Sequence, residues 1–373
     1  MVAGLGLDLQ SKSNIGNVGG VMVSKLAAAA RGIAHFALLA AVALPASVWA
    51  FPFDAIYVLG DSLSDQGNLF AATRAAAGPA NALPDATRYF NGRFSNGPVY
   101  TDILAHDLGL TLGPSIAGGN NFAYGGARTN YNTVEQVAGG PFPNGLFPWS
   151  LNAEVQAFSA RGVHDPNALY IVFSGSNDIG DILSRNLNPA TVIPTAVGGI
   201  VNAVQAFASA GARTVLVMNI PDLGLTPAFN FLGPPTTNPA SALSRQFNDA
   251  LAGALASFTG LNIIQFQTDD LLNAVVANPG LYGLSNVTAP CYTGFVTPNP
   301  GATVCANPSQ YLFWDQVHPT AGVQAILAEA VRETVPEPST VWLLLATLLA
   351  FAVTSRKFVA AARPFPVLLK GNS

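Results

Sequence analysis

Short apolar runs alternate with longer amphipathic stretches through the central part of the chain. Four of these runs are rich in β-branched or aromatic residues and are bounded by polar turns, which is typical of strands buried on both faces of a parallel sheet. The predicted strands begin at Ala55, Ala168, Thr214 and Asn262, and the predicted helices cover residues 198–210, 241–258 and 320–333. This alternation predicts a three-layer α/β/α sandwich with a doubly wound, mostly parallel sheet.

Apolar residues also cluster near the start of the chain. Residues 34–50 form an apolar run that follows Lys25 and Arg31 and ends in small residues. That layout is typical of a secretory signal peptide, so we expect residues 1–50 to be removed on export. Met22 offers a second start codon, and either a misassigned upstream start or an extended leader fits the residues before it.

A second apolar cluster lies near the other end. Residues 341–353 are uncharged and largely apolar, and they precede Arg356 and Lys357. This run is shorter than the roughly 20 residues of a stable membrane-spanning helix. Together with the Pro-Glu-Pro tripeptide at residues 336–338, it resembles the PEP-CTERM sorting signal of Gram-negative bacteria. The resemblance implies that an exosortase processes residues 336–373 after a transient membrane contact. An ordinary weak anchor is the alternative.

The residues between the two signals, 51–335, have the length of one large domain. They carry 9 arginines, no lysine and 18 acidic residues, which gives a formal charge of −9. Nucleic acid is therefore not expected as a partner, since phosphate binding needs a positive field. We expect the domain to be exported through the inner membrane and to reside in the periplasm, on the cell surface or outside the cell.

Two cysteines, Cys291 and Cys305, lie close together in a segment rich in Pro, Asn and Gly. In an oxidising compartment this spacing predicts a local disulfide, and a pair of buried free thiols is the alternative. A zinc site is not expected, because no third and fourth ligand follow at a suitable spacing. No metal or other cofactor is predicted.

Polar residues gather where the predicted strands end, which is where doubly wound sheets bind ligands. Asp61 and Ser62 follow the first strand, and the segment SGSND with Asn177 follows the second. Further on, the segment FWDQVHPT sets Asp315 three residues before His318. That spacing lets the carboxylate orient the imidazole as a general base. A serine hydroxyl needs such a base to become a nucleophile.

Four motifs in this order resemble the GDSL, or SGNH, family of esterases and lipases. They are GDSLSDQGN with Ser62, NFAYGGA with Gly126, GSND with Asn177, and DQVHPT with Asp315 and His318. The resemblance implies the flavodoxin-like SGNH hydrolase fold, with Ser62 as nucleophile, His318 as general base and acid, and Asp315 as the residue that orients it. It also implies an oxyanion hole formed by the backbone N–H groups of Ser62 and Gly126 and by the Asn177 amide.

Other polar residues near these motifs have structural explanations. We expect Asp61 and Asp65 to cap the turn around Ser62, because Asp is favoured at such positions. Asp178 is expected to support its own loop. Asn68 could line the site or form a turn, and the turn is the favoured interpretation.

The leading functional hypothesis is a serine esterase or lipase that hydrolyses acyl or lipid esters through an acyl-enzyme. The segment 139–151, rich in aromatic residues and proline, could line an acyl-chain groove or cover a sheet edge. A deacetylase of an extracellular polysaccharide is the enzyme alternative, since a sorting signal suggests a cell-surface matrix. A catalytically idle surface binding protein is the third hypothesis, but binding alone has no need of all three triad residues.

Overall fold

A computed structural model of the protein describes residues 53–130, 150–335 and 348. The predicted signal peptide lies outside these residues, as do nearly all of the predicted groove segment 139–151 and the predicted sorting signal. The elements described below all belong to one compact unit, which spans Phe51–Glu337.

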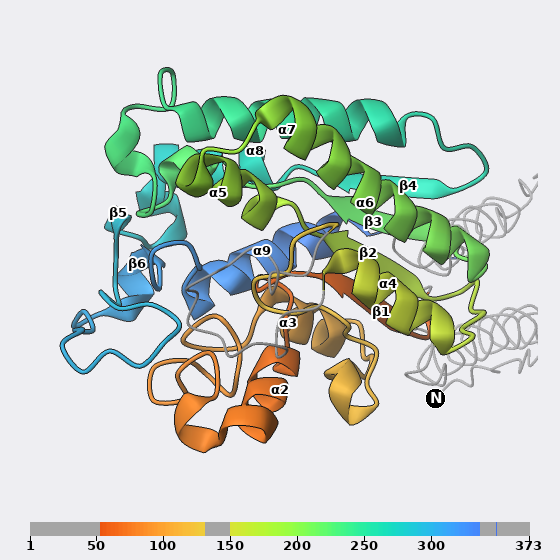
Figure 1. The fold of residues 1–373 in the computed structure, drawn as a ribbon, viewed down its shortest axis with the longest axis horizontal. Helices are drawn as coiled ribbons and strands as arrows, with labels where there is room; N and C mark the ends of the chain where they lie inside the picture. Colours follow the sequence, from red (N-terminus) through yellow and green to blue (C-terminus); the bar gives the residue numbers. More distant parts are fainter. Residues whose placement is uncertain (1–52, 131–149, 336–347, 349–373) are drawn as a thin grey trace, which may run out of the picture. The chain divides into compact units, whose positions relative to one another are not determined.

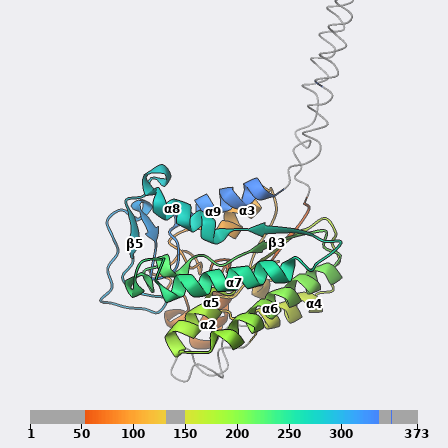
Figure 2. The ribbon, with the colours of Figure 1, turned by 90° about the horizontal axis from the view of Figure 1, so that it is seen from above.

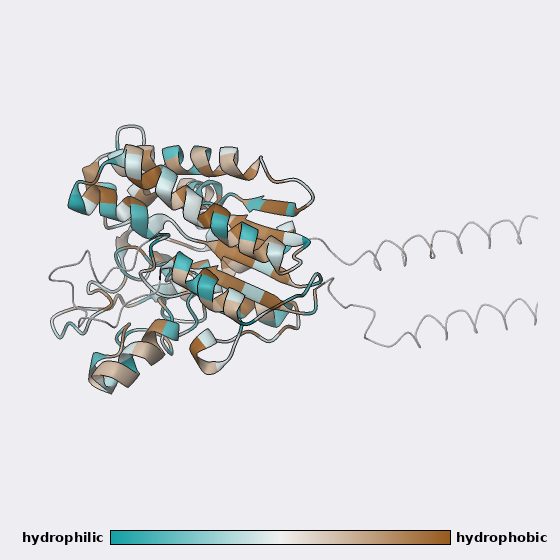
Figure 3. Cartoon of the chain, turned by 45° about the vertical axis from the view of Figure 1, so that its right-hand side comes forward, coloured by the Kyte–Doolittle hydropathy of each residue, from teal (hydrophilic) through white to brown (hydrophobic). Residues whose placement is uncertain are grey.

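Four parallel strands in sequential order form the main sheet (Figure 1). They are β1 (Ile56–Gly60), β2 (Leu169–Phe173), β3 (Thr214–Met218) and β4 (Asn262–Phe266). The four predicted strands are therefore confirmed, each to within one residue at either end. Strand β2 is buried along its whole length, which explains its uninterrupted apolar sequence. Figure 3 shows the central strands as predominantly hydrophobic.

Residues 120–124 extend this sheet along the free side of β1. The Val58 N–H donates to the carbonyl of Asn120 at 3.1 Å, and the Phe122 N–H donates to the carbonyl of Val58 at 2.8 Å. The chain thus leaves β1 toward one side and returns on the other side to form β2. Such a reversal marks the crevice at which doubly wound sheets bind ligands, and Ser62 follows β1 at this point.

Helices cover both faces of the sheet (Figures 1 and 2). One face packs against α4 (Leu151–Ala160), α5 (Ser176–Arg185), α6 (Pro189–Ser209) and α7 (Pro239–Leu255), and the other against α3 (Tyr100–Asp107), α8 (Thr268–Ala277) and α9 (Ala321–Thr334). Side chains of β2 alternate between two cores, with Tyr170 and Val172 in the first and Leu169 and Ile171 in the second. The three-layer α/β/α architecture is therefore confirmed.

The remaining elements lie beyond the carboxyl ends of the strands. Helix α2 (Asn68–Ala77) follows the Ser62 turn, and a small parallel pair is formed by β5 (Asn286–Pro290) and β6 (Tyr311–Phe313). The loop from β6 to α9 carries Asp315 and His318. The small pair thus leads the chain back toward the end of β1.

Helix α6 begins nine residues earlier than the predicted start at Gly198. The Asn188 side chain accepts a hydrogen bond from the Ala190 N–H at 3.0 Å, and Pro189 occupies the first helical position. A proline in the second turn, Pro194, obscures the helical pattern there. Helix α6 is also long and apolar enough to cross a membrane. Its buried side chains, however, belong to the core that it shares with the sheet, and this packing accounts for its apolar character.

Candidate active site

Ser62, His318 and Asp315 form one hydrogen-bonded chain beyond the end of β1. The Oγ of Ser62 lies 2.8 Å from Nε2 of His318. The Nδ1 of the same ring lies 2.7 Å from Oδ2 of Asp315. Ser62 retains 8% of its surface exposed, while Asp315 is fully buried. The fold therefore brings together the predicted nucleophile, base and orienting carboxylate in the order that general-base activation of a hydroxyl requires.

The Asp315 carboxylate has hydrogen-bond partners on both oxygens. Its Oδ1 accepts from the backbone N–H groups of Val317 at 2.9 Å and His318 at 2.8 Å. Burial by itself raises the pKa of Asp315, but the charge of His318 and the hydrogen bonds from His318, Tyr89 and Val317 outweigh it and hold the pKa below its ordinary value. Asp315 is thus held in its ionised form, which is the form that orients an imidazole.

Tyr89 is a member of this network that the sequence did not reveal. Its hydroxyl contacts Oδ2 of Asp315 at 2.5 Å, across a separation of 226 residues. Burial, followed by the nearby Asp315 charge, raises the pKa of Tyr89 far above its ordinary value, so the hydroxyl stays protonated and donates. The sequence around Tyr89 carries no signal for this role, because the partner comes from the other end of the domain.

Two phenylalanine rings flank the imidazole. The ring centroid of Phe94 lies 5.1 Å and that of Phe295 6.1 Å from the centroid of His318. Phe295 is 43% exposed and lies in the loop that the Cys291–Cys305 disulfide closes. The predicted cysteine pairing is therefore present, and it places an aromatic side chain over the imidazole.

Two backbone N–H groups of the predicted oxyanion hole have no hydrogen-bond partner among the described residues. Within residues 53–130 and 150–335, neither the Ser62 N–H nor the Gly126 N–H donates a hydrogen bond. The Gly125 N–H, in contrast, donates to Oδ2 of Asp65 at 2.8 Å. Gly126 is therefore the one of the two adjacent glycines whose N–H is free to meet a ligand, and its φ of +78° suits glycine.

Asn177 lies at the second position of α5, directly beyond the end of β2. Its Nδ2 donates to the carbonyl of Ala127 at 3.0 Å, which ties α5 to the residue after Gly126. A side-chain amide carries two N–H donors, so one remains for a ligand. The neighbouring Asp178 accepts from the Thr129 hydroxyl at 2.8 Å and thus supports the loop that follows Gly126, whereas the expectation was that it supports its own loop.

The acidic residues beside Ser62 stabilise its turn, in agreement with the expectation. Oδ1 of Asp61 accepts from the Leu63 N–H at 3.0 Å, and Oδ1 of Asp65 accepts from the Asn68 N–H at 2.7 Å. The side chain of Asn68 does not have the turn-forming role that the favoured interpretation gave it. Its Nδ2 donates to the carbonyl of Ala123 at 2.9 Å, so it tethers the loop that carries Gly126.

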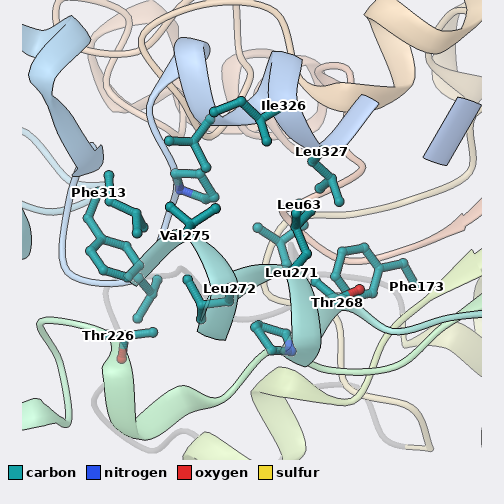
Figure 4. Close-up of a pocket in the computed structure, with 15 residues that line it drawn as sticks. Leu63, Phe173, Thr226, Thr268, Leu271, Leu272, Val275, Phe313, Ile326 and Leu327 are labelled. Carbon is teal, nitrogen blue, oxygen red and sulfur yellow. The ribbon is translucent and has the colours of Figure 1, made fainter. Parts of the chain in front are cut away.

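An apolar cavity lies beside the catalytic candidates, between α8 and α9 (Figure 4). Its wall includes Leu63, which follows Ser62, as well as Val317 and Pro319, which flank His318. The empty space amounts to about 590 Å³, part of it open to solvent. Figure 4 shows side chains from α8 and α9 directed toward it, among them Leu271, Leu272, Val275, Ile326 and Leu327. The cavity is suited to an aliphatic group. Among the described residues, no cluster of His, Cys, Asp or Glu is arranged to bind a metal ion.

Known proteins are similar to this chain over most of its length. Residues 56–331 match the family model for GDSL-like lipases/acylhydrolases, and residues 334–357 match the PEP-CTERM protein-sorting motif, which marks exported proteins. The chain is 32% identical over 332 residues to esterase EstA of Pseudomonas aeruginosa, with 81% of this chain and 50% of that protein covered. It thus spans about half the length of the first curated relatives that it matches.

Two further similarities involve a curated protein and a solved structure. The chain is 27% identical over 319 residues to a phosphatidylcholine-sterol acyltransferase of Aeromonas hydrophila, covering 74% of this chain and 88% of that protein. A solved member of the lipolytic G-D-S-L family from Veillonella parvula superposes with a TM-score of 0.38 at 11% identity, over 75% of this chain and 96% of that chain. Because the family model spans residues 56–331, this chain belongs to the GDSL-like lipase/acylhydrolase family, a family of ester hydrolases, and carries a PEP-CTERM sorting motif.

Proposed function

We propose that this chain is an exported serine esterase or lipase that hydrolyses carboxylic esters through an acyl-enzyme intermediate. The observation that carries the proposal is the hydrogen-bonded chain from Ser62 through His318 to Asp315. The N–H groups of Ser62 and Gly126, which have no partner within the part of the chain that the structure describes, support it, since a nucleophile without oxyanion donors lacks the largest source of transition-state stabilisation.

In the first half of the proposed reaction, Nε2 of His318 takes the proton of Ser62 as Oγ attacks the ester carbonyl. The N–H groups of Ser62 and Gly126 and the Asn177 amide donate to the oxygen that becomes negative. Asp315 stabilises the imidazolium without taking its proton. The imidazolium then protonates the leaving alcohol. In the second half, His318 deprotonates a water molecule that attacks the acyl-enzyme, and the imidazolium returns this proton to the Oγ of Ser62 as the carboxylic acid leaves.

The apolar cavity favours acyl or lipid esters over acetyl esters. Its wall includes Leu63, Val317 and Pro319, which are next to Ser62 or His318 in the sequence, and in the proposal an acyl chain attached to Ser62 buries its methylene groups there. Each buried methylene contributes about 0.8 kcal/mol. A polysaccharide deacetylase, the alternative, would leave most of this cavity unused by its substrate.

The decisive test replaces the three triad residues one at a time. Ser62→Ala and His318→Ala should each abolish hydrolysis of a model ester, and Asp315→Asn should reduce it less, while circular dichroism stays unchanged. Ser62→Ala with activity near wild type would place the nucleophile elsewhere. A folded wild type that hydrolyses no ester, from acetate to long-chain acyl, would favour the idle binding protein.

A chain-length series of esters separates the two enzyme hypotheses. We expect kcat/KM to rise from acetate to medium-chain esters. Leu272→Trp, which fills the cavity, should lower activity on the longer esters and leave acetate hydrolysis nearly unchanged. Phe231→Ala, at a side chain that is 74% exposed, serves as the control. A preference for acetate that Leu272→Trp does not alter would support the deacetylase.

We further propose that residues 1–50 are a signal peptide, residues 51–335 the catalytic domain and residues 336–373 the sorting signal. An exosortase-type enzyme would remove the sorting signal after a transient contact of its apolar segment with the inner membrane. The domain would then remain in the periplasm, on the cell surface or outside the cell. Mass spectrometry of the secreted protein from hosts with and without an exosortase should show a shortened C-terminus only in the first.

A further inference from the structure

Glu154 is a buried carboxylate that the proposed reaction does not use. It lies in the first turn of α4 and is fully buried. Its Oε2 accepts from the Gly60 N–H at 2.8 Å, and its Oε1 accepts from the Tyr124 N–H at 3.3 Å. Gly60 precedes Ser62 by two residues, and Tyr124 precedes Gly126 by two. The carboxylate therefore joins the two backbone segments that carry the unpartnered N–H groups.

A second buried carboxylate holds the next amide of the same loop. Oδ2 of Asp65 accepts from the Gly125 N–H at 2.8 Å, while the Tyr124 N–H also donates to the carbonyl of Gly60 at 3.1 Å. The amides of two consecutive residues are thus engaged. The next residue is Gly126, and its N–H has no hydrogen-bond partner among the described residues.

The loop is also packed tightly on its other side. A Cβ atom on Gly125 would lie 2.1 Å from the ring of Phe94, the ring that contacts His318. The backbone at position 125 therefore lies too close to Phe94 to accommodate a side chain. Its position depends on the carboxylates of Glu154 and Asp65 on one side and on Phe94 on the other.

Burying two carboxylates in this place is energetically costly. Burial is the main cause that raises the pKa of Glu154 well above its ordinary value and that of Asp65 to about 6, and the backbone N–H groups oppose it only in part. An apolar side chain at position 154 would fill the same core space without that cost. The presence of a carboxyl group points to a requirement for geometry, because its two oxygens can accept hydrogen bonds from two segments at once.

We propose that Glu154 and Asp65 are positioning residues for the oxyanion hole. They hold residues 124–125 against the end of β1 and so keep the Gly126 N–H aimed at the same oxygen as the Ser62 N–H. The inference rests on the proposed serine-esterase function. Since oxyanion donors act mainly in the transition state, a loosened loop should lower kcat and change KM little.

The test is Glu154→Gln, which keeps the shape but turns an NH₂ group toward one of the two backbone N–H donors. Gln156→Ala, on the exposed face of the same helix, is the matched control. We expect kcat to fall by roughly 10- to 100-fold, less than the 10²- to 10³-fold loss on direct removal of a donor. The inhibition constant of an alkyl boronic acid, which forms a tetrahedral adduct on serine, should rise in step with the loss of kcat. KM should stay within about twofold of wild type.

A merely structural role would give a different result. It would lower the melting temperature and leave kcat per folded enzyme and boronate affinity at the wild-type values, which would overturn the proposal. The inhibition constant and KM do not depend on the folded fraction of the sample. Should Glu154→Gln not fold, Asp65→Asn tests the same loop through the Gly125 amide and must show the same selective loss.

A double variant provides an independent readout. In the variant that combines Glu154→Gln with Asn177→Ala, the fold-loss in kcat should be smaller than the product of the two single-variant losses, because both residues act on one oxyanion site. Fully multiplicative losses would contradict a shared site. Failure of the proposed serine-esterase function would show as an inactive wild type or as an active Ser62→Ala variant. Failure of the present inference would leave both of these results as expected, so the two are distinguishable.

Discussion

The hydroxyl of Tyr89 and Nδ1 of His318 both contact Oδ2 of Asp315, at 2.5 Å and 2.7 Å. The carboxylate that orients the imidazole is thus itself oriented by a residue from a different part of the chain. Tyr89 packs edge-on against Trp314, the residue before Asp315. The orientation of His318 therefore depends on a buried aromatic cluster as well as on the local turn.

Tyr89→Phe should lower kcat/KM by roughly 10- to 100-fold, because hydrogen bonds to charged groups contribute about 1.5–3 kcal/mol. The Tyr89 bond is one of the causes that lower the pKa of Asp315. Its loss should raise that pKa, so the acidic limb of the pH–rate profile should move to higher pH. Tyr282→Phe, at a partly exposed tyrosine, is the control. An unchanged profile and rate would show that the hydroxyl has no part in orienting Asp315.

Asn177→Ala should reduce kcat by roughly 100- to 1,000-fold with little change in KM, because the lost donor matters mainly in the transition state. The variant also loses the bond to the carbonyl of Ala127, so circular dichroism must accompany the kinetics. An effect confined to KM would instead assign Asn177 to substrate positioning.

Reduction of the Cys291–Cys305 disulfide should lower the free energy of unfolding by about 3 kcal/mol, the chain-entropy value for a loop of about 15 residues. Activity should fall to a smaller degree, because the loop carries Phe295 over His318. Denaturation with and without a reductant measures the first effect, and ester hydrolysis measures the second. Two reactive thiols in denatured, unreduced protein from the periplasm would contradict the disulfide.

Asp61 should make stability depend on pH. Burial, opposed in part by the Leu63 N–H and the charge of His318, raises the pKa of Asp61 from 3.8 to about 6. Its Oδ2 has no hydrogen-bond partner in the described part of the chain, in agreement with a raised pKa. Between these two pH values the folded state holds a proton that the unfolded chain releases. The contribution of Asp61 to the free energy of unfolding is therefore complete below pH 3.8 and is lost as the pH rises through about 6.

Urea denaturation at several pH values between 4 and 7 tests this assignment by comparing wild type with Asp61→Asn. The free energy of unfolding should fall with rising pH more steeply in wild type. Asp65, whose pKa burial also raises to about 6, contributes with the same sign to both proteins. Parallel slopes would mean that Asp61 is ionised throughout this range.

The sequence by itself determined the sheet and the core of the candidate site. Parallel strands buried on both faces appear as continuous apolar runs, so β1 to β4 could be located to within a residue. The Asp315 and His318 pair could be identified because both residues lie in one turn. The short helices α2, α3, α4, α5 and α8 were not predicted, since buried polar side chains such as Glu154 and Asp178 interrupt their apolar faces.

Only the tertiary structure decided which of two adjacent glycines has an N–H without a partner among the described residues, and which tyrosine and which glutamate approach the site. Tyr89 meets Asp315, and Glu154 meets Gly60, across separations of 226 and 94 residues. Contacts of this kind leave no periodic pattern in the chain. Where the partner is a backbone amide, as for Glu154 and Asp65, every residue except proline offers the same donor, so the partner's identity carries no signal in the sequence.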